Sequence, residues 1–94
     1  MQVIMNRTSF EVIIGDLNPE ASVTMQFKDE KPLKGKADEE GNVYFDCKKI
    51  IPKRLREEVI ISVQEKGKPD MEYVYEIRMT KLVSKRVIEV RKEK

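Results

Sequence analysis

The sequence predicts an all-β fold, a sandwich of about seven strands with one short helical turn near residues 52–57. Apolar and polar residues alternate with a period of two in most segments, which is typical of strands with one buried face. Turn-forming residues separate these segments every several positions. The length of 94 residues suits one domain over 1–94. A small oligonucleotide-binding-type barrel is the alternative architecture.

The first half of the chain contains four predicted strands. Residues 10–14 alternate and are stopped by turn residues at 15–19, and residues 21–28 form the cleanest alternating strand. After a turn at 29–32, residues 34–37 form a short edge strand. The turn at 38–42 then leads into a strand at 43–47, with Val43, Phe45 and Cys47 on one face.

The second half contains a crossover followed by three predicted strands. Residues 50–58 are rich in helix formers, and Pro52 is well placed in a first helical turn, so we expect a crossover loop with one such turn. Strands follow at 59–64, 71–79 and 83–90, the first two separated by a turn at 67–70.

The predicted core consists of the apolar residues that share the inward phase of these strands. They are Phe10, Val12, Ile14, Ala21, Val23, Met25, Phe27, Val43, Phe45, Val59, Ile61, Val63, Ile77, Ile88 and Val90.

Two motifs carry a resemblance to a known family. The run Pro-Glu-Ala-Ser-Val at 19–23 resembles a Pro-Gly-Ala-x-Val strand entry, and Ala37 to Phe45 resembles a Thr-Asp-x-x-Gly-x-apolar-x-apolar hairpin. Within the second motif Asp38 can bond its own backbone and Gly41 can take a positive φ. Both motifs are similar to those of the transthyretin-like, carboxypeptidase-regulatory-domain-like branch of the immunoglobulin-like sandwiches, over residues 17–67. Glu20 stands where that family usually has Gly, and residues 52–58 replace its short Pro-Gly-x-Tyr link.

The resemblance implies an immunoglobulin-like (prealbumin-like) β-sandwich. It also implies the roles that such domains usually have, as rigid spacers, as adhesion or binding modules, or as folding partners of a larger protein. A shared fold does not by itself decide between these roles.

Composition excludes several classes of function. The net charge is only +2, from 19 basic and 17 acidic residues, which disfavours a dedicated nucleic-acid binder or strong attraction to anionic membranes. The one cysteine, Cys47, cannot form an internal disulfide and is expected to be a buried, unreactive core thiol. The N-terminus lacks the pattern of a secretory signal and no apolar run has the length of a membrane span, so we expect a soluble, cytoplasmic protein without membrane insertion.

The sequence offers no set of residues for catalysis. Without histidine, triads of the Ser-His-Asp and Cys-His types and histidine–zinc sites are excluded, and one thiol cannot bind zinc alone. The acidic turn at 38–40 lacks the ligand spacing of a calcium loop. No glycine-rich run could hold a phosphate, and no small-molecule substrate is indicated. We therefore expect no enzyme activity, catalytic residues, metal site or cofactor.

Basic residues gather in two stretches, 48–56 and 81–94, the second with six basic and two acidic residues. A nucleic-acid surface at these clusters is the alternative function, although the aromatic residues for base stacking are few. A lysine-rich strand edge that blocks association of sheets is the simpler interpretation. The residues of the alternative surface are Lys53, Arg54, Arg56, Lys85, Arg86 and Arg91.

The preferred prediction is a non-catalytic binding or structural module in a protein assembly. Several apolar residues are out of phase with the core, and a patch of them on one sheet face would mediate self-association or docking of a protein partner. The candidate residues are Ile13, Tyr44, Ile60, Val74 and Val87. A stand-alone sandwich without an export signal would suit a particle assembled in the cytoplasm, such as a phage or surface-assembly component.

Overall fold

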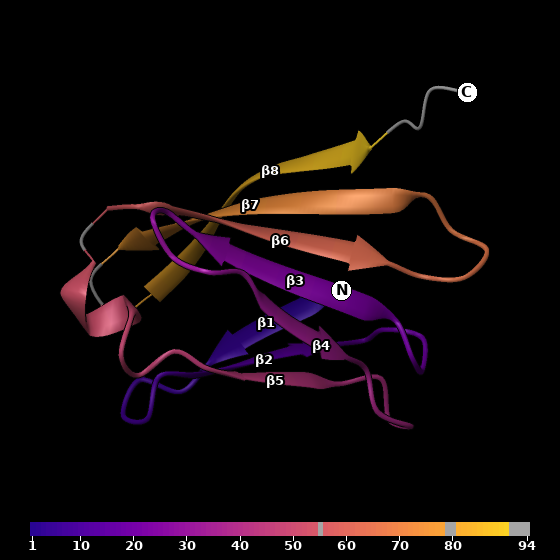
Figure 1. Ribbon diagram of the computed structural model, residues 1–94, viewed down its shortest axis with the longest axis horizontal. Coiled ribbons are helices and arrows are strands. Elements are labelled where there is room, and N and C mark those ends of the chain that lie inside the picture. The colour runs from indigo at the N-terminus through magenta and orange to yellow at the C-terminus, as the bar shows by residue number, and fades with distance from the viewer. Residues whose placement is uncertain (55, 79–80, 91–94) are drawn as a thin grey trace.

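The computed structural model describes residues 1–54, 56–78 and 81–90, and these residues form eight strands and one 3₁₀ turn (Figure 1). In chain order they are β1 (Gln2–Met5), β2 (Glu11–Gly15), β3 (Ser22–Phe27), β4 (Leu33–Lys36), β5 (Val43–Asp46), the 3₁₀ turn η1 (Ile51–Lys53), β6 (Glu58–Gln64), β7 (Asp70–Arg78) and β8 (Lys81–Val90). All seven predicted strands are present. The predicted helical turn is also present, over 51–53 at the start of the expected range.

The strands form two separate antiparallel sheets, so the sandwich is confirmed and the barrel is not. The small sheet has the order β1-β2-β5, and the large sheet has the order β4-β3-β6-β7-β8. In Figure 1 β8 lies along the upper border of the molecule and β5 along the lower border.

The core lies between the two sheets and contains the residues that alternation assigned to it in β2, β3, β5 and β6. Leu17, Ala37 and Ile51 are also buried there, although period-two alternation did not predict them. Ile51 enters the core from η1, whose first turn contains Pro52 as expected. Phe10 is only half-buried and packs against the edge of this core.

One long side of the sandwich is closed by β4 and β5, and we call it the closed side. At Gly35 in β4, an added Cβ would lie 2.8 Å from Val43 Cγ1 and 3.5 Å from Phe45 Cε1 in β5. A side chain at this position would therefore separate the sheets, so glycine is required for the close contact. The connection between β4 and β5 is also tight, because the backbone amides of Glu40 and Asn42 both donate to Asp38 Oδ1 at 3.0 Å.

The opposite long side, between β1 and β7–β8, is open. The large sheet has two more strands than the small sheet, and the extra width lies on this side. Inward-facing residues are fully buried in β3 and β6, but Met71 and Tyr73 in β7 are only half-buried. Val87, the register partner of Tyr73, is 57% exposed. We call this β1–β8 border the open side.

The register of β8 corrects two core predictions. Ile88 is 42% exposed and Val90 is half-buried, and both lie on the outer face of the large sheet. The register shifts between Val74 and Tyr75, which leaves Lys85 as an extra residue in β8. One extra residue reverses the alternation, so Val87 rather than Ile88 faces inward beyond this bulge.

The strand β1 was not predicted at all. Its four residues pair with β2 in the register Gln2↔Gly15 to Met5↔Val12, which turns Val3 and Met5 toward the core. The alternation Gln-Val-Ile-Met has only one polar residue, so it gives a weak period-two signal. The missing strand explains the difference between about seven expected strands and eight in the described residues.

Candidate functional site

The outer face of the small sheet carries a row of apolar side chains. Ile4, Ile13 and Tyr44 are direct register partners across β1, β2 and β5, so they lie side by side on one face. Ile4 is 51% exposed and Tyr44 is 52% exposed, while Ile13 between them is half-buried. An outward face of an antiparallel sheet usually carries polar residues, so three neighbouring apolar residues make this face a candidate binding surface.

Two carboxylates border this row. Glu11 and Asp46 are register partners on the same outer face, and both are exposed. Like charges placed directly opposite each other destabilise a sheet. Within the described residues no ion pair joins either carboxylate to a cation, although Asp46 Oδ1 accepts a hydrogen bond from the Lys48 amide at 3.1 Å. We call the surface formed by Ile4, Ile13, Tyr44, Glu11 and Asp46 the small-sheet face.

The structure divides the predicted patch among three surfaces. Ile13 and Tyr44 lie together on the small-sheet face, where Ile4 joins them. Ile60 and Val74 are register partners on the outer face of the large sheet, and Val87 faces inward on the open side. The five residues therefore do not form one patch.

The expected exposure of Val74 is wrong. Val74 is 2% exposed, although it lies outside the main core cluster. Its strand is flanked on both sides, with Ile60 and Arg86 as its register partners on that face. Val74 is therefore unavailable to a partner, whereas Ile60 remains 37% exposed.

Three of the predicted basic residues are already paired with carboxylates. Arg54 binds Glu57 at 2.8 Å and Glu30 at 3.1 Å, and the hydrogen bond to Glu57 is the main cause that raises the pKa of Arg54. Lys85 lies 3.6 Å from Glu76 Oε2, and Arg86 lies 3.7 Å from Glu58 Oε1.

Glu76 is shared between cations. Arg78 also bonds it, and this hydrogen bond is the main cause that lowers the pKa of Glu76. Lys53 and Arg56 are exposed near η1, and Arg91 lies outside the described residues. Ion pairs thus neutralise three of the five predicted basic residues that the structure describes.

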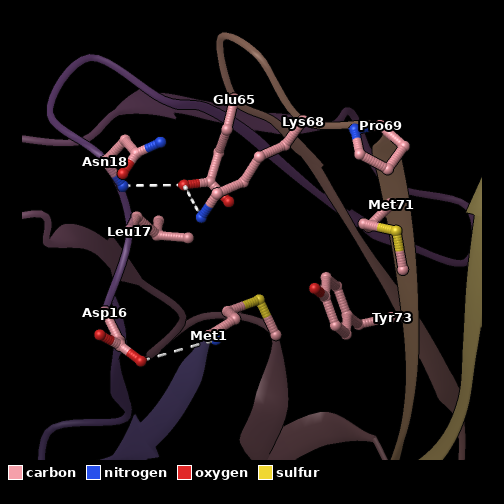
Figure 2. A pocket seen from close by; sticks show the side chains of 9 residues that line it. All are labelled: Met1, Asp16, Leu17, Asn18, Glu65, Lys68, Pro69, Met71 and Tyr73. Carbon is pink, nitrogen blue, oxygen red and sulfur yellow. Dashed lines mark hydrogen bonds and ion pairs between the residues drawn. The ribbon is translucent and has the colours of Figure 1, made fainter.

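A pocket of about 440 Å³ opens at one end of the open side (Figure 2). Figure 2 shows Met1 and Tyr73 pointing toward one another across it, below a polar bridge in which Glu65 Oε2 accepts the Asn18 amide at 2.8 Å and lies 3.7 Å from Lys68 Nζ. Burial, aided by the nearby charge of Glu65, raises the pKa of the Tyr73 hydroxyl. Both carboxylates at this pocket are paired, Asp16 with the Met1 amine at 3.9 Å and Glu65 with Lys68.

The described residues contain no group of three His, Cys, Asp or Glu side chains arranged to hold a metal ion. Cys47 is fully buried, as expected, and desolvation raises the pKa of its thiol to about 12, with a smaller contribution from the charge of Asp46. A thiol with that pKa stays protonated near neutral pH and is a poor nucleophile.

Comparisons of the chain with protein-family models, with curated proteins and with solved structures found no match. In the described part of the chain, no helix has the length and apolar character needed to cross a bilayer.

Sequence reasoning found two of the three apolar residues on the small-sheet face and missed Ile4. In an extended strand Ile4 must face away from its neighbours Val3 and Met5, which point toward the core. This alternation could have identified Ile4 as an outward residue, but only if residues 2–5 had been recognised as a strand. The acidic pair was missed as well, because Glu11 and Asp46 become neighbours only through the β2–β5 pairing.

Proposed function

We propose that this chain is a non-catalytic module that binds a protein partner through its small-sheet face. The observation that carries the proposal is the continuous row Ile4–Ile13–Tyr44, with its two end residues more than half exposed. Apolar groups placed side by side at a surface gain free energy when a partner removes them from water. The adjacent Glu11 and Asp46 favour a partner that places a lysine or arginine beside an apolar contact.

The transthyretin-like resemblance of residues 17–67 supports this proposal, because domains of that branch commonly serve as binding modules or spacers. The cytoplasm remains our proposed location, and a component of a phage or surface assembly remains our proposed context. Nucleic-acid binding has less support, since Arg54, Lys85 and Arg86 already pair with carboxylates.

Capture of a partner by matched variants tests the proposal. The wild-type chain, Ile4→Lys, Tyr44→Lys and the control Ile60→Lys would each be immobilised and exposed to extract from the source cells. The control changes an apolar residue that is also exposed, but on the outer face of the large sheet.

We expect a protein that the wild type and Ile60→Lys retain and that Ile4→Lys and Tyr44→Lys lose at least tenfold. A partner retained equally by all four chains would contradict the small-sheet face. Bound nucleic acid that is lost in Lys53→Glu and Arg56→Glu would favour the alternative function instead.

A further inference from the structure

The open side exposes part of the inner face of the large sheet. Along this face, burial decreases from β6, where Ile61 is fully buried, through Tyr73 in β7 to Val87 in β8, which is 57% exposed. These residues are successive register partners, so the decrease follows the width of the sheet. The small sheet ends at β1 and does not extend over Val87 in β8.

The edge of β1 that borders this surface is free in the described part of the chain, because β1 pairs only with β2. A strand edge with free amide and carbonyl groups can pair with a further strand, and natural proteins usually block such edges with charge or proline. Outer strand β4 carries Lys34 and Lys36, and β8 carries Lys81, Lys85 and Arg86. Strand β1, with the sequence Gln-Val-Ile-Met, has no charged residue and no proline.

Cavities lie along the open side at both ends of β1. At the end near Met1, the 440 Å³ pocket is lined by Met71 and Tyr73 from β7. At the end near Met5, a second pocket of about 210 Å³ lies between Val3 and Met5 on one side and Leu82 on the other. The space beside β1 is therefore bordered by apolar side chains at both ends, together with the polar residues Asp16, Asn18, Glu65 and Lys68 at the Met1 end.

We propose that β1 accepts one extended strand from a partner protein, which pairs antiparallel with it and covers the inner faces of β7 and β8. The added strand would bring the small sheet to four strands. Its inward residues, at every second position, would be apolar and would contact Val87 and Tyr73. This mode of recognition uses main-chain hydrogen bonds for affinity and alternate side chains for specificity.

The charges at the Met5 end define the partner further. Arg7 and Lys81 are exposed at the second pocket, and within the described residues neither has a carboxylate within ion-pair distance. An antiparallel partner strand begins at this end, since β1 ends there. The proposed strand therefore begins with an acidic residue and continues with alternating apolar residues.

This inference goes beyond the proposed function, because it concerns the edge of β1 rather than the small-sheet face. It can be tested in the full chain by an extension before Met1 that consists of Asp-Asp, three Thr-Val repeats and an Asn-Gly turn, which places the valines opposite the inward residues Val3 and Met5. The turn favours an antiparallel hairpin, and the covalent connection raises the effective concentration of the strand into the millimolar range.

The thermal midpoint of the extended chain should rise by about 5 °C or more over that of the natural chain. Val87→Lys should abolish this gain, because a charge would lie under the added strand. The matched control Ile88→Lys changes the next residue, on the opposite face of the same strand, and should keep the gain. Replacement of the two added aspartates by lysines should reduce the gain, and Arg7→Glu with Lys81→Glu should restore it.

Three results would overturn the proposal. The midpoint could stay unchanged, or an extension with a central proline could raise it equally, since proline cannot complete the main-chain pairing. Alternatively, sedimentation of the natural chain could show a dimer that Val87→Lys dissociates, which would mean that a second copy occupies the open side. None of these results depends on Ile4 or Tyr44, so the failure of this proposal would be distinguishable from a failure of the proposed function of the small-sheet face.

Discussion

The two long sides of this sandwich differ although both are formed by edge strands. On the closed side β4 lies against β5, and Gly35 removes the side chain that would keep them apart. On the open side β1 and β8 do not meet in this way, and Val87 remains 57% exposed. Sheets of unequal width thus bury the apolar residues of one side and leave apolar residues of the other side exposed.

The largest expected effect lies in the core beside the closed side. Phe45 is 5% exposed and borders Gly35, so Phe45→Ala should reduce the free energy of unfolding by about 3–5 kcal/mol. The matched change on the open side, Val87→Ala, should cost less than about 0.5 kcal/mol. Urea denaturation measures both, and similar costs for the two variants would remove the distinction between the sides.

A smaller effect is expected at a glycine of the loop that joins β4 to β5. Gly41 has a φ of +81°, and an added Cβ would lie 2.1 Å from the Leu17 carbonyl oxygen. Gly41→Ala should therefore cost about 3 kcal/mol, from the left-handed backbone and the backbone displacement together. Gly67→Ala, with a φ of +79° and nothing within 4 Å, should cost only about 1 kcal/mol. If denaturant unfolding gave the two variants equal losses in the free energy of unfolding, the backbone around Gly41 would be shown to accommodate a Cβ without strain.

Alkaline pH should lower the stability of the fold, because three buried or half-buried groups have raised pKa values. The pKa of the Cys47 thiol is about 12 in the folded chain and 9.0 when it is unperturbed, so the unfolded chain loses this proton first as pH rises. Stability should then decrease between pH 9 and 12, by up to about 1.4 kcal/mol per pH unit.

The control for this pH effect is Cys47→Ala, in which the decrease between pH 9 and 10 should largely disappear. Above pH 10 a decrease should remain, because burial also raises the pKa values of Tyr73 and Tyr75 beside the open side. Urea midpoints measured across this range give both slopes. A wild-type slope that the variant keeps unchanged would contradict the assignment to Cys47.

The smallest expected effect is a gain in stability. Glu20 has a φ of +66°, in the left-handed region that favours glycine, and its amide donates to the Ala37 carbonyl at 2.9 Å. Glu20→Gly should relieve this conformation and raise the free energy of unfolding by about 1 kcal/mol. A loss of stability in the same denaturation experiment would mean that the Glu20 side chain contributes more than its backbone costs.

The sequence predicted those parts of the fold that depend on local alternation. Strands β2 to β8 and the burial of Phe45 and Cys47 follow from a period of two. The bulge at Lys85 could not be predicted, because one extra residue changes the face of Val87 and Ile88 without altering the pattern of the segment.

The candidate surface depended on pairing between distant strands, which alternation does not reveal. Tyr44 and Ile13 could be identified as outward residues, but their alignment with Ile4 requires the order β1-β2-β5. Val74 was misplaced because burial on an outer face results from its neighbours on both flanking strands rather than from its phase.

Native-state hydrogen exchange tests the central contrast most directly, because β1 and β5 are both edges of the same sheet and both pair with β2. The hydrogen-bonded amides of β5, held by the closed side, should exchange only through global unfolding. Those of β1, on the open side, should exchange about 100-fold faster through local opening. Equal protection of β1 and β5 would contradict the account.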